Sequence, residues 1–295
     1  MYLFYCDQYD LGLPPEHRFP ASKYGLLRES LQGDSRFTLL PAPLATRDEI
    51  VAAHHPPYVD AFLAGTLDKS AIRRIGFPWS PQLVERTLAS AGATLAATQS
   101  AIKQGISGAL SGGTHHAFYA EGSGFCVFND VAIAIAHLRA HTALKRFAVI
   151  DLDVHQGDGT AHIFADDPGV FTLSLHGRNN FPFRKQRSTI DVELDDHTGD
   201  NAYLEVLDAV LPRAFAFDPE FVFYQSGVDP LKEDTLGKLD LSLEGLAARD
   251  RRVFTAVRNH GAPLVITIGG GYANPIELTA AAHAQTYRLA ADLTA

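Results

Sequence analysis

The chain has 295 residues, of which 46% are hydrophobic, with two cysteines and a formal net charge of −9. Two cysteines are too few for a disulfide-stapled secreted scaffold, which favours a reducing cytoplasm, and no long apolar run predicts a membrane span. The sequence shows no basic patch of the kind that nucleic-acid binders carry, and no basic segment of the kind that opens a secretory signal. With no linker, repeat or low-complexity tract, we expect one domain over residues 1–295.

Short apolar runs rich in β-forming residues alternate with helix-like stretches along the chain. In chain order, we predict strand Tyr2–Cys6, helix Ser80–Gly105, strand Gly108–Gly113, helix Asn129–His141, strand Phe147–His155, strand Val170–His176, helix Asn201–Phe217, strand Phe221–Asp229, helix Ser242–His260, strand Pro263–Tyr272 and helix Asn274–Leu293. Strands that are apolar at nearly every position are buried on both faces, as in a parallel sheet. The alternation therefore predicts an α/β fold with a mostly parallel sheet.

Polar clusters follow four of these apolar runs, at the point where each run ends. They are Gly112–His116, Asp151–His155, Ser226–Pro230 and Gly269–Tyr272. Ligands of open α/β sheets bind beyond the carboxyl ends of the strands. We therefore expect the four clusters to meet at one edge of the sheet and to form the functional site.

The segment Ile150–His155 carries three ionisable side chains in an otherwise apolar run. If it is extended, Asp151, Asp153 and His155 share one face. Burying them costs several kcal/mol unless they are paired or bind a metal, and carboxylate with imidazole suits a divalent ion such as zinc. Asp229 is the natural third ligand. The alternatives are a hydrogen-bonded network at the strand end and, for Asp229-Pro230, an ordinary turn.

Two neighbouring histidines follow a double glycine. Beside a metal, His115 and His116 suit a general acid/base and an electrostatic stabiliser, although histidines are often packing or surface residues. Each needs a carboxylate to fix its tautomer, and Asp151 and Asp158 are the candidates. Tyr272, after three glycines, is placed to donate a hydrogen bond to a developing oxyanion. Fingerprints for nucleotide binding and for the serine-hydrolase nucleophile are absent.

Together these segments resemble the histone deacetylase family. The resemblance rests on Gly112–Ala117, Gly124–Asp130, Ile150–Thr160, Ser226–Pro230 and Gly269–Tyr272, in the family's order. It implies an arginase/deacetylase-like three-layer fold, with helices on both faces of an eight-stranded sheet. The compact N-terminal part, with Glu16–Pro20, is most similar to the class IV branch and its bacterial relatives.

The resemblance also implies roles for individual residues. Zinc is held by Asp153, His155 and Asp229, with iron(II) as the alternative ion. His115 pairs with Asp151 and His116 with Asp158, and His116 is the general base and acid. Tyr272 stabilises the tetrahedral oxyanion. The residues matched to the substrate tunnel are Gly124, Phe125, Phe181, Gly270 and Gly271, and those matched to a monovalent cation such as potassium are Asp151, Asp153, His155, Ser174 and Leu175.

The implied activity is removal of acetyl or longer acyl groups from lysine side chains of proteins, by hydrolysis of a linear amide. Gln156 stands where many relatives have a second histidine, and the acidic loop residue that other classes use to grip the substrate has no counterpart near Ile75–Trp79. Deacetylation of polyamines or other small acylated amines therefore stays open. The acidic balance favours cationic substrates by long-range attraction, or serves solubility alone.

Two other functions use the same kind of scaffold. An arginase-type ureohydrolase needs a two-metal site with an Asp-x-Asp pair, and the run that ends at Asp229 supplies one carboxylate. A catalytically silent acyl-lysine binder is expected to have lost a metal ligand, His116 or Tyr272, and all of them are present. We expect neither a nucleic acid nor a membrane as partner, and the oligomeric state stays open.

Overall fold

The apolar runs become the strands of one sheet in the computed structural model, which describes residues 1–14 and 16–294. The strands are β1 Tyr2–Tyr5, β2 Thr38–Pro41, β3 Ile106–Ala109, β4 Phe147–Asp151, β5 Val170–Gly177, β6 Ile190–Leu194, β7 Phe221–Gln225 and β8 Leu264–Thr267. Their order is β2-β1-β3-β8-β7-β4-β5-β6, and every pair is parallel. The predicted α/β fold with an eight-stranded sheet is confirmed.

The helices begin and end at residues that suit those positions. They are α1 Ser22–Leu31, α2 Arg47–Val51, α3 Pro56–Leu63, α4 Lys69–Ile75, α5 Pro81–Gln104, α6 Asp130–His141, α7 Asp158–Ile163, α8 Asp200–Ala216, α9 Leu243–His260 and α10 Ile276–Thr294. The Ser80 hydroxyl accepts from the Leu83 amide before α5, and the Asn129 side chain accepts from the Ala132 amide before α6. Such caps satisfy amides that have no partner within the helix. Of the described helices, none is both long and apolar enough to cross a bilayer.

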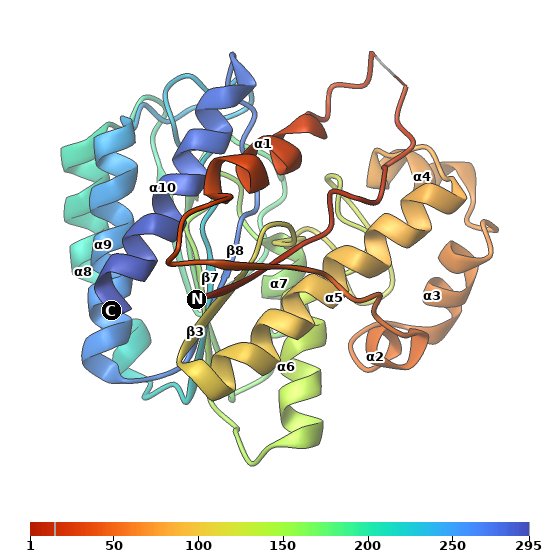
Figure 1. Cartoon of the computed structure of the whole chain (residues 1–295), viewed down its shortest axis with the longest axis horizontal. Coiled ribbons are helices and arrows are strands. Elements are labelled where there is room, and N and C mark those ends of the chain that lie inside the picture. The colour runs from red at the N-terminus through yellow and green to blue at the C-terminus, as the bar shows by residue number, and fades with distance from the viewer. Residues whose placement is uncertain (15, 295) are drawn as a thin grey trace.

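Alternate residues of the central strands pack against helices on opposite faces of the sheet. In β4, Phe147 and Val149 belong to a cluster with residues of α5 and α6. Ala148 and Ile150 belong to a second cluster, with residues of α1, α8, α9 and α10. Figure 1 shows the sheet nearly edge-on between these two groups of helices. The predicted three-layer arrangement follows from this period-two burial.

Four strands end four or five residues earlier than predicted. β3 ends at Ala109 instead of Gly113, β4 at Asp151 instead of His155, β7 at Gln225 instead of Asp229, and β8 at Thr267 instead of Tyr272. The expectation that Ile150–His155 is extended throughout is therefore wrong, because the chain bends at residues 153–155. Beyond each strand end, the polar residues hydrogen-bond to one another instead of continuing the sheet.

Candidate active site

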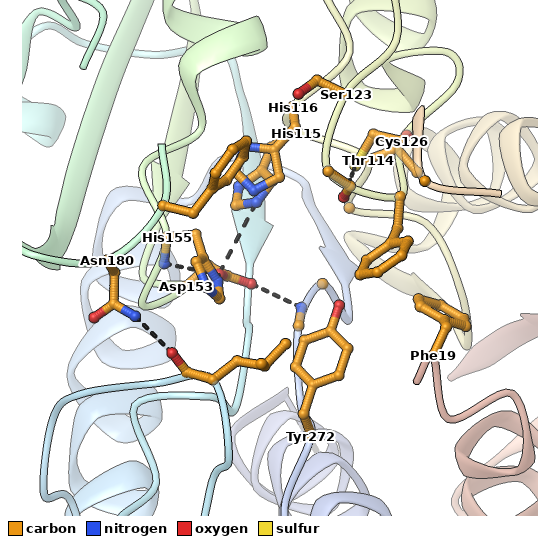
Figure 2. Close-up of a pocket in the computed structure, with 18 of the residues that line it drawn as sticks. Phe19, Thr114, His115, His116, Ser123, Cys126, Asp153, His155, Asn180 and Tyr272 are labelled. Atoms are coloured by element: carbon orange, nitrogen blue, oxygen red, sulfur yellow. Dashed lines mark hydrogen bonds and ion pairs between the residues drawn. The ribbon is translucent and has the colours of Figure 1, made fainter. Parts of the chain in front are cut away.

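The site lies where the four central strands β3, β8, β7 and β4 end side by side. A cavity of about 610 Å³ opens there, and residues of all four predicted polar clusters lie at it or directly behind it. Figure 2 shows Asp153, His155, His115, His116 and Tyr272 gathered around its inner end. The position agrees with the general rule for open α/β sheets.

Three buried side chains form a group that could hold a metal ion. Ligand atoms of Asp153, His155 and Asp229 all lie within 4.8 Å of one another. His155 Nδ1 is 3.0 Å from Asp229 Oδ2 and 3.1 Å from Asp153 Oδ1. The amides of Val154 and Gly270 donate to Asp229 and Asp153 at 2.8 and 2.7 Å, which fixes both carboxylates. Burial and the neighbouring Asp153 raise the pKa of Asp229 to about 7, because two buried carboxylates repel each other.

The two histidines hydrogen-bond to different carboxylates. His115 Nδ1 is 2.8 Å from Asp151 Oδ2, and His116 Nδ1 is 2.6 Å from Asp158 Oδ1. Burial lowers the pKa of His115, but Asp151 and Asp153 outweigh it and raise this pKa to about 9. Burial and the charge of His115 lower the pKa of His116 to about 4. At neutral pH, His116 is therefore the neutral member of the pair, with Nδ1–H donating to Asp158 and the Nε2 lone pair free.

The histidine loop is fixed by Asp130 at the start of α6. Its carboxylate accepts from the amides of Gly113 and Thr114 at 2.9 and 2.8 Å, and from the hydroxyls of Thr94 and Thr114 at 2.6 and 2.7 Å. Gly112 has φ of 78°, and a Cβ there would come within 2.4 Å of Asp130 Oδ2. Sequence reasoning assigned Asp130 no role, although an acidic residue in the first turn of a helix is a signal for such a contact.

Tyr272 is oriented by two residues that sequence reasoning also missed. The Tyr272 amide donates to Asp234 Oδ2 at 2.6 Å. The buried Lys23 ammonium donates to the carbonyls of Gly269 and Gly271 at 3.3 and 3.4 Å and lies over the Tyr272 ring. Burial raises the pKa of Tyr272 well above its usual value, so the phenol keeps its proton. No sequence motif links Lys23 to a loop almost 250 residues away.

The residues predicted for the substrate tunnel lie along the cavity, with one exception. Gly124, Phe125, Phe181 and Gly270 line it, whereas Gly271 is not among the described lining residues. A Cβ at Gly124 would lie 2.7 Å from His116 Cδ2 and 3.1 Å from the Phe181 ring. The Phe181 ring contacts His116 edge-on, with centroids 4.9 Å apart. The absence of a side chain at Gly124, whose φ is 53°, thus lets the backbone lie directly against the His116 and Phe181 rings.

The residues predicted to bind a monovalent cation lie in β4, in the neighbouring strand β5 and in the segment that follows β4. In the pairing of β4 with β5, Asp151 lies opposite Ser174, and Leu175 follows. The Ser174 hydroxyl is 2.9 Å from His176 Nδ1, and both residues are buried. A role for this group in cation binding stays a prediction.

Comparison with known proteins agrees with this geometry. The family model of the histone deacetylase domain matches residues 16–289. The chain belongs to the histone deacetylase family. Histone deacetylase 2 of Arabidopsis thaliana is 30% identical over 92% of this chain and 74% of its own length. An uncharacterized protein of Picosynechococcus is 42% identical, with 98% of each chain covered.

A rat protein named polyamine deacetylase HDAC10 is 32% identical over 78% of this chain, which spans 43% of that protein. The named relatives thus include both histone and polyamine deacetylases. Membership of this family supports a hydrolytic deacetylase. It favours that class of enzyme over the arginase-type ureohydrolase that was the alternative in the sequence analysis.

Proposed function

We propose that this protein is a zinc-dependent amidohydrolase that removes acetyl or longer acyl groups from lysine side chains of proteins. The observation that carries the proposal is the juxtaposition, around one cavity, of the Asp153–His155–Asp229 group with a neutral His116 and a protonated Tyr272. The tunnel residues Gly124, Phe125 and Phe181 add a narrow path for an aliphatic stem. Potassium at Asp151, Asp153, His155, Ser174 and Leu175 is part of the proposal.

The donor set fits a divalent ion. Asp153 and Asp229 are both completely buried, and a cation between them would offset the repulsion that raises the pKa of Asp229. Two carboxylate oxygens and an imidazole nitrogen are the ligand types that zinc accepts at catalytic sites, and iron(II) accepts the same set. When bound, the ion would lower the pKa of water towards about 7 and polarise the amide carbonyl.

His116 acts as general base and then as general acid. Its free Nε2 takes a proton as water attacks the amide carbon, and it returns this proton to the leaving amine nitrogen. Asp158 stabilises the imidazolium that forms. The cationic His115, paired with Asp151, adds positive potential beside the developing negative charge, and the Tyr272 hydroxyl donates a hydrogen bond to that oxygen.

Deacetylation of polyamines or other small acylated amines is the second candidate, because a relative is named polyamine deacetylase. The buried free cysteines Cys6 and Cys126 suit a reducing compartment, and we place the reaction in the cytoplasm. We include no direct contact with nucleic acid or a membrane in this function.

The test measures amine release from peptides carrying acetyl- or longer acyl-lysine and from acetylated polyamines. We expect turnover of the peptides that a chelator abolishes, that added zinc restores and that a hydroxamate inhibits. Preference for acetylated polyamines over every peptide would instead favour the second candidate. Turnover that persists in chelator would refute a metal-dependent mechanism.

A further inference from the structure

The mouth of the cavity carries positive charge although the whole chain has a net charge of −9. We define the mouth as the exposed residues that line the cavity: Arg18, Arg73, Arg74, Asn179, Phe183, Leu236 and Lys238. Four of them are cationic and none is anionic. Among the described lining residues, the one carboxylate is Asp153, which is fully buried at the metal group.

The four cations come from three separate segments around the opening. Arg18 precedes α1, Arg73 and Arg74 lie in the last turn of α4, and Lys238 follows β7. Arg74 pairs with Glu121 at 3.2 Å, and Lys238 Nζ lies 3.8 Å from Asp196. Within the described part of the chain, Arg18 and Arg73 have no carboxylate within 4 Å, and the Arg18 guanidinium lies over the Phe125 ring. The guanidinium groups of Arg18 and Arg73 are thus left for a ligand, and the exposed ammonium of Lys238, whose contact with Asp196 is longer than a hydrogen bond, can face a ligand as well.

Two exposed apolar side chains share the mouth with these cations. Phe183, in the segment between β5 and β6, is 88% exposed, and Leu236 is 36% exposed. The protein's own residues leave the Phe183 ring exposed, and its one ring contact among the described residues is to Phe181 in the cavity. Exposed aromatic and arginine side chains around one opening are typical of surfaces that bind a polypeptide.

We propose that the mouth selects acylated lysines that lie in acidic protein segments, with carboxylates on either side of the lysine facing Arg18, Arg73 and Lys238. This rests on the proposed deacylase function. A polyamine would place further ammonium groups against these cations, and such like-charge contacts are unfavourable. A segment reaches several cations and the Phe183 ring at once, whereas the single carboxylate of a free acyl-lysine reaches fewer.

The acidic charge of the whole protein does not oppose this selection at contact distance. Salt screens interactions between exposed charges beyond about 10 Å at an ionic strength of 0.1 M. A peptide at the mouth therefore responds chiefly to the mouth's own charges. Its preference for acidic flanks should weaken as salt is added.

The experiment compares three acetyl-lysine peptides of equal length, with acidic, neutral or basic residues on both sides of the lysine. We expect kcat/KM to be about tenfold higher for the acidic than for the basic peptide at low salt, with a smaller ratio at high salt. Free acetyl-lysine and an acetylated polyamine complete the panel, and both should be poorer substrates than the acidic peptide.

Charge reversal locates the effect. Arg73→Glu and Lys238→Glu should each lower the ratio of acidic to basic kcat/KM several-fold, and the double variant should invert it. The matched control is Arg213→Glu, which changes an exposed arginine in α8, away from the mouth, and should leave the ratio unchanged. Circular dichroism and metal content verify that each variant is folded.

The outcomes separate this inference from the deacylase function. Equal turnover of the three peptides, or a preference for the basic peptide or the polyamine, would overturn the inference while deacylation itself stood. Faster turnover of free acetyl-lysine than of the acidic peptide would overturn it in favour of a small carboxylated substrate. If no substrate is turned over, the deacylase proposal fails, and fluorescence anisotropy of the labelled peptides still tests whether the mouth binds acidic segments more tightly.

Discussion

His115 and His116 are consecutive residues with opposite electrostatic surroundings. The pKa of His115 is about 9 because Asp151 and Asp153 outweigh its burial, whereas burial and the charge of His115 hold the pKa of His116 at about 4. Replacing His116 by alanine should reduce turnover at least ~10²-fold, since general acid–base catalysis contributes about that much, while the metal stays bound. Turnover and metal content of purified His116→Ala check this expectation. Persistent activity would remove His116 as the base.

The Tyr272 hydroxyl is the hydrogen-bond donor proposed for the developing oxyanion. Tyr272→Phe removes one oxygen atom and keeps the ring over which Lys23 lies. We expect kcat to fall ~10²-fold or more with little change in stability, because the lost interaction is made in the transition state. Tyr119→Phe, at a tyrosine that is 47% exposed, is the matched control. If Tyr272→Phe turns over substrate as fast as the wild type, the donor lies elsewhere.

At the scale of elements, Asp130 connects three parts of the chain: α5 through Thr94, the loop that carries the histidines, and α6. Asp130→Ala would leave the buried amide of Gly113 and the partly buried amide of Thr114 without their acceptor. We expect the free energy of unfolding to fall by about 2–4 kcal/mol, measured by urea denaturation, with a larger relative loss of activity. A decrease below about 1 kcal/mol would show that the loop keeps its conformation without this carboxylate.

His54 connects the segment between α2 and α3 to the start of α6. Its Nε2 accepts from the Asn129 amide at 2.8 Å, and its Nδ1–H donates to the Phe118 carbonyl at 3.0 Å, so the ring must be neutral. Burial lowers the pKa of His54 from 6.5 to about 4. Between these values the unfolded chain binds the proton and the folded protein does not. Stability due to this group is therefore complete above pH 6.5 and decreases as the pH falls, by up to about 3 kcal/mol.

The measurement is the free energy of unfolding of chelator-treated protein between pH 4 and 7. His54→Gln should be less stable at pH 7 and should depend less steeply on pH than the wild type. The exposed neighbour offers a control, since His55→Gln should keep the wild-type dependence. An unchanged pH dependence in His54→Gln would assign the acid sensitivity to other groups.

Sequence patterns predicted the central elements but not the edges of the sheet. Six of the eight strands and the five long helices overlap predicted elements, because strands inside a parallel sheet are apolar at most positions. The edge strands β2 and β6 were missed, since their residues are mostly partly exposed or exposed and read as loops. Helices α1 to α4 and α7 were missed as well, since each has ten residues or fewer. The buried apolar residues of α2, α3 and α4 pack in a cluster that contains no strand residue.

At the scale of the whole molecule, the net charge and the charge at the mouth of the cavity differ in sign. The net charge of −9 left open whether it attracts cationic substrates or serves solubility alone, whereas the mouth has four exposed cations, two of which pair with Glu121 and Asp196. Arg18, Arg73 and Lys238 are far apart in the sequence, and only folding places them around one opening. Sequence patterns could predict that the candidate metal ligands and the two histidines lie together, because each cluster directly follows an apolar run. Lys23, Asp130 and Asp234 make contacts that no local pattern records.

The measurement that tests the central claim most directly is a zinc titration of metal-free protein, with bound zinc and deacylation followed in the same samples. We predict that turnover of an acyl-lysine peptide rises in proportion to bound zinc and saturates at one ion per chain. Asp153→Ala leaves two of the three proposed ligands. This variant should not bind a full equivalent of zinc and should stay inactive. Deacylation by the metal-free protein, or full zinc binding by Asp153→Ala, would contradict the account.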